Sequence, residues 1–328
     1  MEQNKSVNLN ETAFQKAENL IRKSDEFKIT VEMLNNGVRI IDAGVKCFGS
    51  SSAGVKIAEI CMGGIGEVRL ECDMKENLSS RIFVSSSNPV TACLASQYAG
   101  WSLGLKEKDN FGKAFNCLGS GPARVKAKKE KLIADLGVED NSNKAVLVME
   151  VDSYPPKKII STILEECGVN PENLILIITP TTSFAGTIQV VSRVLEVALH
   201  KLHELKFPLE SVEEGFGSAP IPLPANDFLT AMGRTNDAIL YGGLVNLTVN
   251  CTDSEAQILA QSLPSCNSEA YGKSFSKIFE SVSYDFYKID PLLFAPAKVV
   301  IGNKRSGKSW VYGKTDFPLL ENLWIKKS

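Results

Sequence analysis

The chain has 328 residues, of which 44% are hydrophobic and 23% charged, and its formal net charge at pH 7 is −2. This length exceeds that of one hydrophobic core and favours two domains, and the near-neutral charge gives no sign of nucleic-acid binding. The N-terminus lacks the apolar segment of a signal peptide, no apolar run approaches the ~20 residues that span a bilayer, and the cysteines are scattered. We therefore expect a cytoplasmic protein with reduced cysteines that binds neither nucleic acid nor a membrane.

The first part of the chain predicts one long helix followed by strands and turns. Residues 11–35 are expected to form a helix that runs into a short turn, and VRIIDAGV at 38–45 alternates in the manner of a strand. Two glycine-rich runs, 49–54 and 62–66, are expected to be tight turns between strands, although glycine also lets a ligand approach the backbone closely. RIFVSSS at 81–87 predicts a further strand.

The middle of the chain predicts alternating helices and strands, as in an αβ layer. The glycine turn LGSGPAR at 118–124 is expected to open a charged helix. Its backbone N–H groups and Arg124 can hold an anion, or the turn can simply begin that helix. The expected helices cover about 88–104, 123–137 and 155–168, and the expected buried strands cover 145–151 and 173–179.

The stretch TPTTSFAGTIQVVSRVLEVALHKLHEL at 179–205 changes from turn residues into a strongly periodic helix. At ~100° per residue its polar side lies opposite an apolar stripe. That polar side carries Gln189, Arg193, Glu196, His200 and His203. Periodicity alone favours an ordinary surface helix on which Arg193 and Glu196 form a solvated pair. The small, uncharged residues that precede the helix favour instead a helix start that faces a cavity.

The last part of the chain mixes an irregular segment with helices and strands. Residues 206–232 are rich in proline and glycine and predict a long irregular segment. GRTND at 233–237 predicts a polar turn, and AILYGGLVNLTVN after it reads as a strand. Helices are expected near 253–263 and 272–283, and a strand at 298–303.

Two patterns suggest other kinds of site. His200 and His203, with Glu196 or Glu204, can be read as metal ligands of a metallohydrolase, but H-x-x-H is a tighter spacing than the pair in H-E-x-x-H. The run GNKRSGKS at 302–309 matches G-x-x-x-x-G-K-[ST], yet the aromatic and β-branched SWVYG follows where a phosphate-binding loop needs a helix. We expect a hairpin turn at 302–309 and no metal site.

Six segments of the chain form one recognisable series. They are NNGVRIIDAGV (35–45), CMGGIG (61–66), LGSGPAR (118–124), SFAGTIQVVSRVLE (183–196), MGRTNDAILYGG (232–243) and YDFYKIDPLLFAPAKV (284–299). Together, and in this order, they resemble the methenyltetrahydromethanopterin cyclohydrolase family, with GRTNDAILYGG as the most specific segment. One departure is KCFGSSSAG at 46–54, which lacks a proline that the family has in this loop.

The resemblance implies an enzyme of one-carbon metabolism, a pathway of methane-forming, methane-oxidising and methylotrophic cells. The enzyme reversibly hydrolyses N5,N10-methenyl-tetrahydromethanopterin to the N5-formyl compound. The resemblance also implies an α+β fold of two α/β-type domains with the pterin in an active-site cleft between them, a homotrimer, and no metal or nucleotide cofactor. We expect a β-rich domain built from residues 1–80 and 206–328, with an αβ domain at 81–205 inserted.

The resemblance also implies a catalytic pair, because the family's Arg-x-x-Glu maps onto Arg193 and Glu196. The methenyl carbon belongs to an amidinium-like cation and is already electrophilic, so the reaction needs a positioned water and a base. We expect Glu196 to be the general base and Arg193 to orient it through a charge-assisted hydrogen bond. The expected substrate-binding residues are Ser120, Gly121, Gln189, Arg234, Thr235, Asn236 and Asp237.

A pterin-binding protein without catalysis is a further alternative, and retention of both Arg193 and Glu196 argues against it. If the cyclohydrolase interpretation holds, the polar side of the helix from Gln189 to Glu196 lines a cleft, while His203 reaches solvent.

Overall fold

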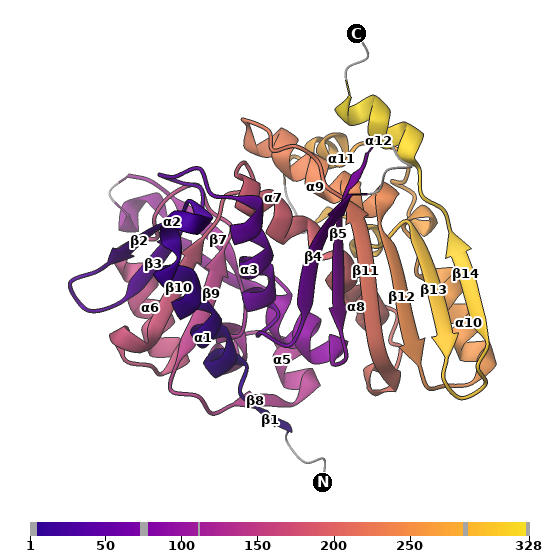
Figure 1. Ribbon diagram of the computed structural model, residues 1–328, viewed down its shortest axis with the longest axis horizontal. Helices are drawn as coiled ribbons and strands as arrows, with labels where there is room; N and C mark the ends of the chain where they lie inside the picture. The colour runs from indigo at the N-terminus through magenta and orange to yellow at the C-terminus, as the bar shows by residue number, and fades with distance from the viewer. Residues whose placement is uncertain (1–4, 73–77, 111, 285–287, 326–328) are drawn as a thin grey trace. The chain divides into compact units, whose positions relative to one another are not determined.

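The computed structural model shows helices packed on two six-stranded mixed sheets (Figure 1). The predicted α+β class with two α/β-type domains is confirmed. None of the eight cysteines, all of which lie in the described residues, forms a disulfide. No helix in the described part of the chain is long and apolar enough to cross a membrane. The structure describes residues 5–72, 78–110, 112–284 and 288–325, so part of the segment 284–299 lies outside it.

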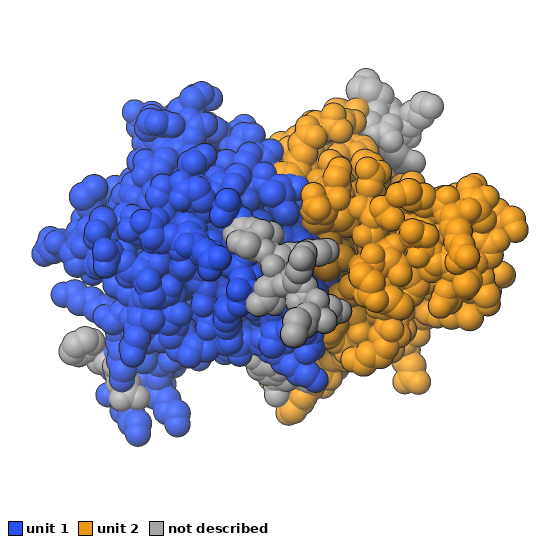
Figure 2. All heavy atoms as spheres, turned by 90° about the horizontal axis from the view of Figure 1, so that it is seen from below, with its two compact units in different colours: residues 1–65, 91–189 blue, residues 66–90, 190–328 orange. Residues whose placement is uncertain are grey.

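The chain folds into two compact units, each built from two separate stretches (Figure 2). The first unit consists of residues 1–65 and 91–189, and the second of residues 66–90 and 190–328.

The first unit is built on a sheet with the strand order β2-β3-β10-β9-β7-β6. β3, β10 and β9 run parallel to one another, whereas β2 and β7 run antiparallel to their neighbours. A small second sheet pairs β1 with β8. The strands are β1 (Lys5–Val7), β2 (Thr30–Met33), β3 (Arg39–Asp42), β6 (Trp101–Leu105), β7 (Phe115–Ser120), β8 (Val138–Asp140), β9 (Ala145–Met149) and β10 (Leu174–Ile178). The helices are α1 (Leu9–Arg22), α2 (Ser24–Phe27), α3 (Ser51–Cys61), α4 (Ala123–Ala127), α5 (Lys131–Leu136), α6 (Lys157–Cys167) and α7 (Phe184–Val191), with the π-helix η1 (Val90–Gln97) and the 3₁₀ turns η2 (Glu107–Asp109) and η3 (Pro171–Asn173).

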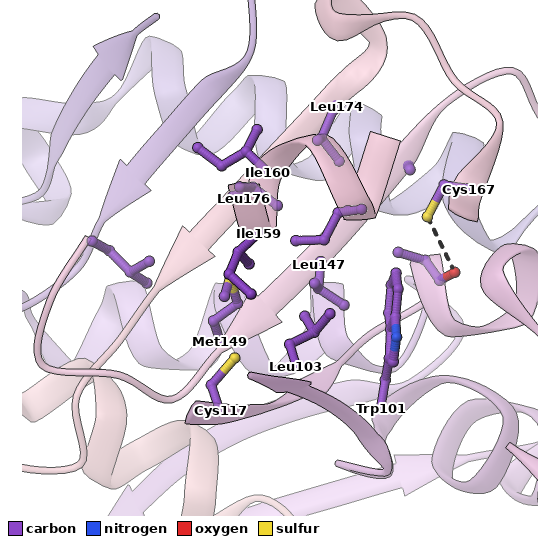
Figure 3. Close-up of a cluster of buried hydrophobic side chains, with 14 of the residues drawn as sticks. Trp101, Leu103, Cys117, Leu147, Met149, Ile159, Ile160, Cys167, Leu174 and Leu176 are labelled. Carbon is purple, nitrogen blue, oxygen red and sulfur yellow. Dashed lines mark hydrogen bonds between the residues drawn. The ribbon is translucent and has the colours of Figure 1, made fainter. Parts of the chain in front are cut away.

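Apolar side chains cover both faces of this sheet, because successive residues of a strand point to opposite sides. Leu174 and Leu176 of β10 pack with Ile159 and Ile160 of α6 on one face (Figure 3). Ile175 packs on the other face with side chains of α1 and α3. Burial on both faces explains why the central parallel strands read as continuous apolar runs in the sequence.

The second unit is built on a sheet with the strand order β14-β13-β12-β11-β5-β4. All its neighbouring strands are antiparallel except β12 and β13, which are parallel. The strands are β4 (Glu67–Cys72), β5 (Ser80–Ser86), β11 (Val212–Pro220), β12 (Leu244–Val249), β13 (Lys298–Asn303) and β14 (Ser309–Gly313). The helices are α8 (Val194–Glu204), α9 (Phe228–Gly242), α10 (Asp253–Ser262), α11 (Phe275–Ser281) and α12 (Phe317–Trp324), with the 3₁₀ turns η4 (Leu209–Ser211), η5 (Ser265–Asn267) and η7 (Pro291–Leu293).

Helices of the second unit pack both on the sheet and on one another. α8 lies against β11 and β12, and α10 against β13 and β14. α9, α11 and α12 share a separate apolar cluster that includes Tyr241, Phe275, Phe279 and Leu320. The rings of Phe275 and Phe279 stack within it, with their centroids 6.3 Å apart.

The bounds of the two compact units differ from those of the two domains expected from the sequence. The expected domains are residues 1–80 together with 206–328, and residues 81–205. Strand pairing accounts for the difference. β3, from the N-terminal stretch, pairs with β10, so that stretch folds with the middle of the chain. β5 pairs with β11 and joins the other sheet.

Several N-terminal elements differ from the sequence predictions. The expected helix over 11–35 is divided at Lys23 into α1 and α2, and α2 ends at Phe27 because Lys28 takes a left-handed conformation (φ 55°) before strand β2. The glycine-rich run 49–54 is not a turn between strands but the start of α3, where the Ser50 hydroxyl accepts the N–H of Ala53 at 3.0 Å. Gly54 stands in this helix because a Cβ there would lie 2.6 Å from the Cβ of Ile188.

Two predicted middle helices are also interrupted. The helix expected over 88–104 is the π-helix η1, which is followed by strand β6. The charged helix expected over 123–137 is split into α4 and α5, since Lys128 has a positive φ of 50°. The expected strands at 145–151 and 173–179 and the helix at 155–168 are confirmed as β9, β10 and α6.

In the last third, the segment expected to be irregular contains β11, and the expected turn and strand at 233–243 form the long helix α9. Asp227 begins α9 by accepting the N–H of Thr230 at 2.8 Å. The expected helices near 253–263 and 272–283 are confirmed as α10 and α11. The hairpin at 302–309 is also confirmed, because β13 and β14 are antiparallel.

Candidate active site

The Arg193–Glu196 pair lies where the predicted long helix is broken into two. α7 ends at Val191, and Arg193 occupies the N-cap position of α8 with φ −76° and ψ 2°. Glu196 is in the first turn of α8, where the positive end of the helix dipole favours a carboxylate. Arg193 Nη1 donates to Glu196 Oε2 at 3.4 Å. The break therefore places an arginine and a carboxylate together at a helix start.

Glycines of the second unit hold the start of α8 close to the sheet. A Cβ at Gly215 would lie 2.8 Å from Leu195 Cδ1, and one at Gly217 would lie 2.9 Å from Val194 Cγ1. A Cβ at Gly243 would lie 3.2 Å from the other methyl group of Val194. Two glycines at alternate positions of a strand are the sequence signal of a close approach. The stretch that carries them is strand β11 and not the irregular segment that its proline and glycine content predicts.

The Arg193–Glu196 pair is buried, so the interpretation as a solvated surface pair is wrong. The two side chains are 11% and 5% exposed. Apolar residues of α8 are buried on either side of Glu196 in the chain, including Leu195 and Ala198. An ion pair in such a place is less screened by solvent than one on the surface.

The two histidines lie farther along α8 and contact a different carboxylate. His203 Nδ1 is 3.4 Å and His200 Nε2 is 3.9 Å from Glu204 Oε1. The His203 side chain is 24% exposed, in accord with the expectation that it reaches solvent. Among the described residues no group of three or more His, Cys, Asp or Glu side chains is placed to hold a metal ion. The geometry does not favour the metallohydrolase alternative.

Gln189 of α7 is 1% exposed. Within the described part of the chain its Oε1 atom is buried and has no hydrogen-bond partner. Leaving a buried acceptor unpaired costs about 1–3 kcal/mol, so this oxygen is suited to accept a hydrogen bond from a bound molecule.

Ser120 and Gly121 form the turn between β7 and α4 in the first unit. Gly121 has φ +98°, a conformation that favours glycine, and its N–H donates to the carbonyl of Ser96 at 2.9 Å. The Ser120 hydroxyl is 2% exposed and lies 3.3 Å from the thiol of Cys61. The turn is thus packed against the end of η1 and against α3.

Arg124, which the sequence suggested as an anion ligand behind this turn, is already paired within the protein. Its side chain is fully buried, and Nε donates to Glu130 at 2.7 Å. Nη1 donates to the carbonyls of Leu94, Ala95 and Ser96 at 3.1, 3.2 and 3.0 Å. Of the two interpretations weighed for this turn, the helix start with a structural arginine agrees with the structure.

The four candidate residues of GRTND occupy successive positions of helix α9 and so point in different directions. Arg234 donates to the carbonyl of Leu223 at 3.2 Å. Thr235 and Asn236 both donate from their side chains to the carbonyl of Met232, at 3.0 and 2.9 Å. The dense polar turn that the sequence suggested is therefore a helix whose polar side chains partly serve its own backbone.

Asp237 is buried, and its carboxylate accepts the N–H of Phe275, the first residue of α11, at 2.7 Å. Burial raises the pKa of this carboxyl to about 7, and the hydrogen bond from Phe275 opposes the rise. Asp237 therefore holds α11 against α9.

The lysine of the G-x-x-x-x-G-K-S run also has a structural partner. Lys308 Nζ lies 2.8 Å from Asp253 Oδ2, and the pKa of Asp253 is lowered to about 2 by its hydrogen bonds to Lys308 and Ser306. No phosphate-binding helix start is present at this hairpin, which agrees with the sequence interpretation.

Comparison with known proteins shows which family has this arrangement of segments. The family model described as cyclohydrolase (MCH) matches residues 8–324, nearly the whole described chain. The chain belongs to this family. The resemblance stated from the six segments is confirmed.

Curated members of the family match the chain over most of both lengths. It is 50% identical over 303 residues to the methenyltetrahydromethanopterin cyclohydrolase of Methylobacillus flagellatus, which covers 92% of this chain and 90% of the relative. The protein of the same name from Xanthobacter autotrophicus is 48% identical over 307 residues, with 92% and 88% covered. That from Methanocorpusculum labreanum is 38% identical over 312 residues, with 94% and 96% covered.

Proposed function

We propose that this protein is an enzyme of one-carbon metabolism that reversibly hydrolyses N5,N10-methenyl-tetrahydromethanopterin to N5-formyl-tetrahydromethanopterin. The observation that carries the proposal is the near full-length membership of the cyclohydrolase family, whose curated relatives share that substrate in their names. The buried Arg193–Glu196 pair gives the chain a carboxylate suited to the chemistry.

The reaction adds one water molecule to a cationic carbon and releases one proton. Glu196 takes a proton from the water as its oxygen bonds to the methenyl carbon, which gives a neutral tetrahedral adduct. The bond from that carbon to N10 then breaks, and Glu196 returns its proton to N10. The remaining hydroxyl proton leaves to solvent as the formyl C=O forms. In this sequence the carboxylate first offsets the charge of the substrate cation and then acts as base and acid.

Arg193 acts on Glu196 rather than on the carbon. Its hydrogen bond at 3.4 Å restricts the carboxylate to orientations in which the other oxygen can face the water. An arginine suits this role because its guanidinium stays charged at all relevant pH values.

The substrate-binding set is proposed as Ser120, Gly121, Gln189, Arg234, Thr235, Asn236 and Asp237. The support is strongest for Gln189, because its buried Oε1 is an acceptor with no partner among the described residues. Arg234 keeps further N–H donors beyond its bond to Leu223, so it can also hold the substrate. Asp237 has the weakest support, because its carboxylate is engaged at the start of α11.

Three further properties are proposed. A homotrimeric assembly and catalysis without a metal or a nucleotide cofactor follow from the family resemblance, and a cytoplasmic location is the one expected from the sequence. A pterin-binding role without catalysis is not favoured, because Arg193 and Glu196 are in contact and buried.

Loss of the methenyl chromophore with purified protein tests the proposal. Wild-type protein should consume the methenyl compound, and Glu196→Gln should lower kcat by about 10²- to 10⁴-fold, as loss of a general base does. Glu204→Gln is the matched control: it makes the same change on the same helix, at a carboxylate that contacts the histidines. Full activity in Glu196→Gln would remove this residue as the base, and an inactive wild-type protein would remove the proposed reaction.

A further inference from the structure

Phe48 is displayed almost fully to solvent by a loop that is itself tightly built. Its side chain is 88% exposed, although phenylalanine is among the residues most often buried. Exposed aromatic side chains that are held in place are typical anchors of binding sites. The loop that carries it, residues 43–50, joins β3 to α3.

Hydrogen bonds fix this loop at both ends. At its start, the Asp42 carboxylate accepts the N–H groups of Gly44, Val45 and Lys46 at 2.9, 2.7 and 2.8 Å. At its end, the N–H of Gly49 donates to the carbonyl of Lys28 at 3.0 Å. Gly49 has φ +64°, and a Cβ there would lie 2.6 Å from the carbonyl oxygen of Ala43. The exposure of Phe48 is therefore imposed by the backbone on either side of it.

A second exposed phenylalanine belongs to the element packed against this loop. Phe184, the first residue of α7, is 48% exposed. Gly49, which follows Phe48, lies against Ala185, which follows Phe184: a Cβ at Gly49 would lie 3.3 Å from the Cβ of Ala185. The Ser183 hydroxyl, just before Phe184, donates to the carbonyl of Ala43 at 3.1 Å. These contacts lie within the first unit and hold together the two backbone segments that carry the exposed rings.

The two segments follow the carboxyl ends of two neighbouring parallel strands. β3 and β10 pair up to Asp42 and Ile178. The loop begins directly after Asp42, and α7 follows Ile178 after residues 179–183. In sheets of this kind, ligands bind outside the carboxyl ends of the strands. Exposed Met33 is not part of this surface, because it pairs with Arg39 at the other end of β3.

We propose that Phe48 and Phe184 form an aromatic platform that binds the flat bicyclic ring of the pterin substrate. The inference rests on the proposed function, which supplies a planar heteroaromatic ring joined to a cationic amidinium group. Aromatic faces attract both kinds of group, the ring by stacking and the cation through the quadrupole. The platform lies within the segments 46–54 and 183–196, the first of which departs from the family pattern, so Phe48 is a candidate determinant of ring preference.

Kinetics and direct binding test the platform. Phe48→Ala and Phe184→Ala should each raise KM for methenyl-tetrahydromethanopterin about tenfold and leave kcat within about twofold, because stacking is lost but the base is kept. Equilibrium dialysis with formyl-tetrahydromethanopterin should show the same loss of affinity. Phe48→Tyr should restore KM, whereas Phe48→Leu, which is apolar without a ring, should not.

Phe216→Ala is the matched control, because Phe216 is 49% exposed on β11 and belongs to neither the loop nor α7. Equal KM and equal affinity in all three alanine variants would overturn the platform while leaving the proposed reaction intact. The platform would also be overturned if Phe48→Ala or Phe184→Ala changed the molar mass of the protein in light scattering but not its affinity for the formyl compound. The rings would then form contacts between chains. A third outcome separates the two proposals. If wild-type protein binds the formyl compound, loses this affinity in Phe48→Ala, and does not hydrolyse the methenyl compound, the platform is supported and the proposed hydrolysis is refuted.

Discussion

Asp237 is a buried carboxyl whose surroundings favour its uncharged form. Burial raises its pKa from 3.8 to about 7. In the unfolded chain the group ionises near its ordinary pKa, so between pH 4 and 7 the folded protein binds more protons than the unfolded one. The contribution of Asp237 to the free energy of unfolding is therefore greatest below pH 4. It falls as the pH rises toward 7, by up to about 1.4 kcal/mol per pH unit.

We expect Asp237→Asn to remove this pH dependence. The asparagine does not ionise, and its Oδ1 can still accept the N–H of Phe275. Relative to wild type, the variant should gain unfolding free energy steadily from pH 5 to pH 7 and little more above pH 7. Urea denaturation at pH 5, 6, 7 and 8 measures the difference.

The control for this prediction is Asp227→Asn, the N-cap of α9. The pKa of Asp227 is lowered by the N–H of Thr230, so the group is fully ionised throughout this range. The difference in unfolding free energy between Asp227→Asn and wild type should therefore stay constant between pH 5 and 8. Parallel stability curves for Asp237→Asn and wild type would contradict the assignment of a raised pKa to Asp237.

At the scale of elements, one arginine holds the end of the π-helix η1. The last carbonyls of a helix lack partners in the helix, and three of those of η1 converge on Arg124 Nη1. Glu130 balances the charge, and the ring of Tyr98 lies 5.2 Å from the guanidinium carbon. Because Ser96 also accepts the N–H of Gly121, the same arginine holds the candidate turn at Ser120.

Arg124→Met should therefore destabilise the protein by about 3–5 kcal/mol, because it leaves Glu130 without its buried partner and removes the donor to the carbonyls of Leu94 and Ala95. The unfolding free energy of Arg124→Lys should lie between those of Arg124→Met and wild type, because lysine keeps the charge but cannot form the planar set of donors of a guanidinium group. Lys128→Met is the control: its ion pair with Glu139 is half exposed, so the change should stay within about 0.5 kcal/mol. Denaturant midpoints measure all three, and equal losses for Arg124→Met and Lys128→Met would refute the role of Arg124.

Elements with a strong period and conventional ends could be predicted from the sequence. β9 and β10 are short β-branched runs, α6 follows a proline pair, and α10 begins with the capping box of Thr252 and Glu255. The failures share a cause, which is that tertiary packing overrides local composition. α9 contains GRTND and ends at Gly242, yet it is a helix that packs against α11, α12 and β11. Glycine stands at its end because Pro220 and Leu320 occupy the space that a Cβ of Gly242 would need.

At the scale of the whole molecule, the order of segments identified the family, but the pairing of strands could not be read from it. The pairing of β3 with β10 and that of β5 with β11 each join stretches that lie far apart in the chain. Nothing in the sequence of either strand indicates its partner. Glu196 is a candidate base because the family resemblance supplies the Arg-x-x-Glu pair, whereas the periodicity of the helix alone favours a solvated surface pair. The exposure of Phe48 could not be predicted, because the sequence does not reveal that a hydrogen-bonded loop holds this ring in solvent.

Activity of the whole enzyme is expected to be independent of a bound metal ion. The methenyl carbon is electrophilic by its own charge, and both histidines of the chain lie within 3.9 Å of Glu204 Oε1. Incubation with EDTA followed by dialysis should leave kcat/KM within about twofold, and so should His200→Ala. A metallohydrolase built on Glu196, His200 and His203 requires both treatments to abolish turnover, with recovery on adding back Zn²⁺ after the chelator. Loss and recovery of this kind, together with an inactive His200→Ala variant, would transfer the catalytic role from the Arg193–Glu196 pair to a metal centre.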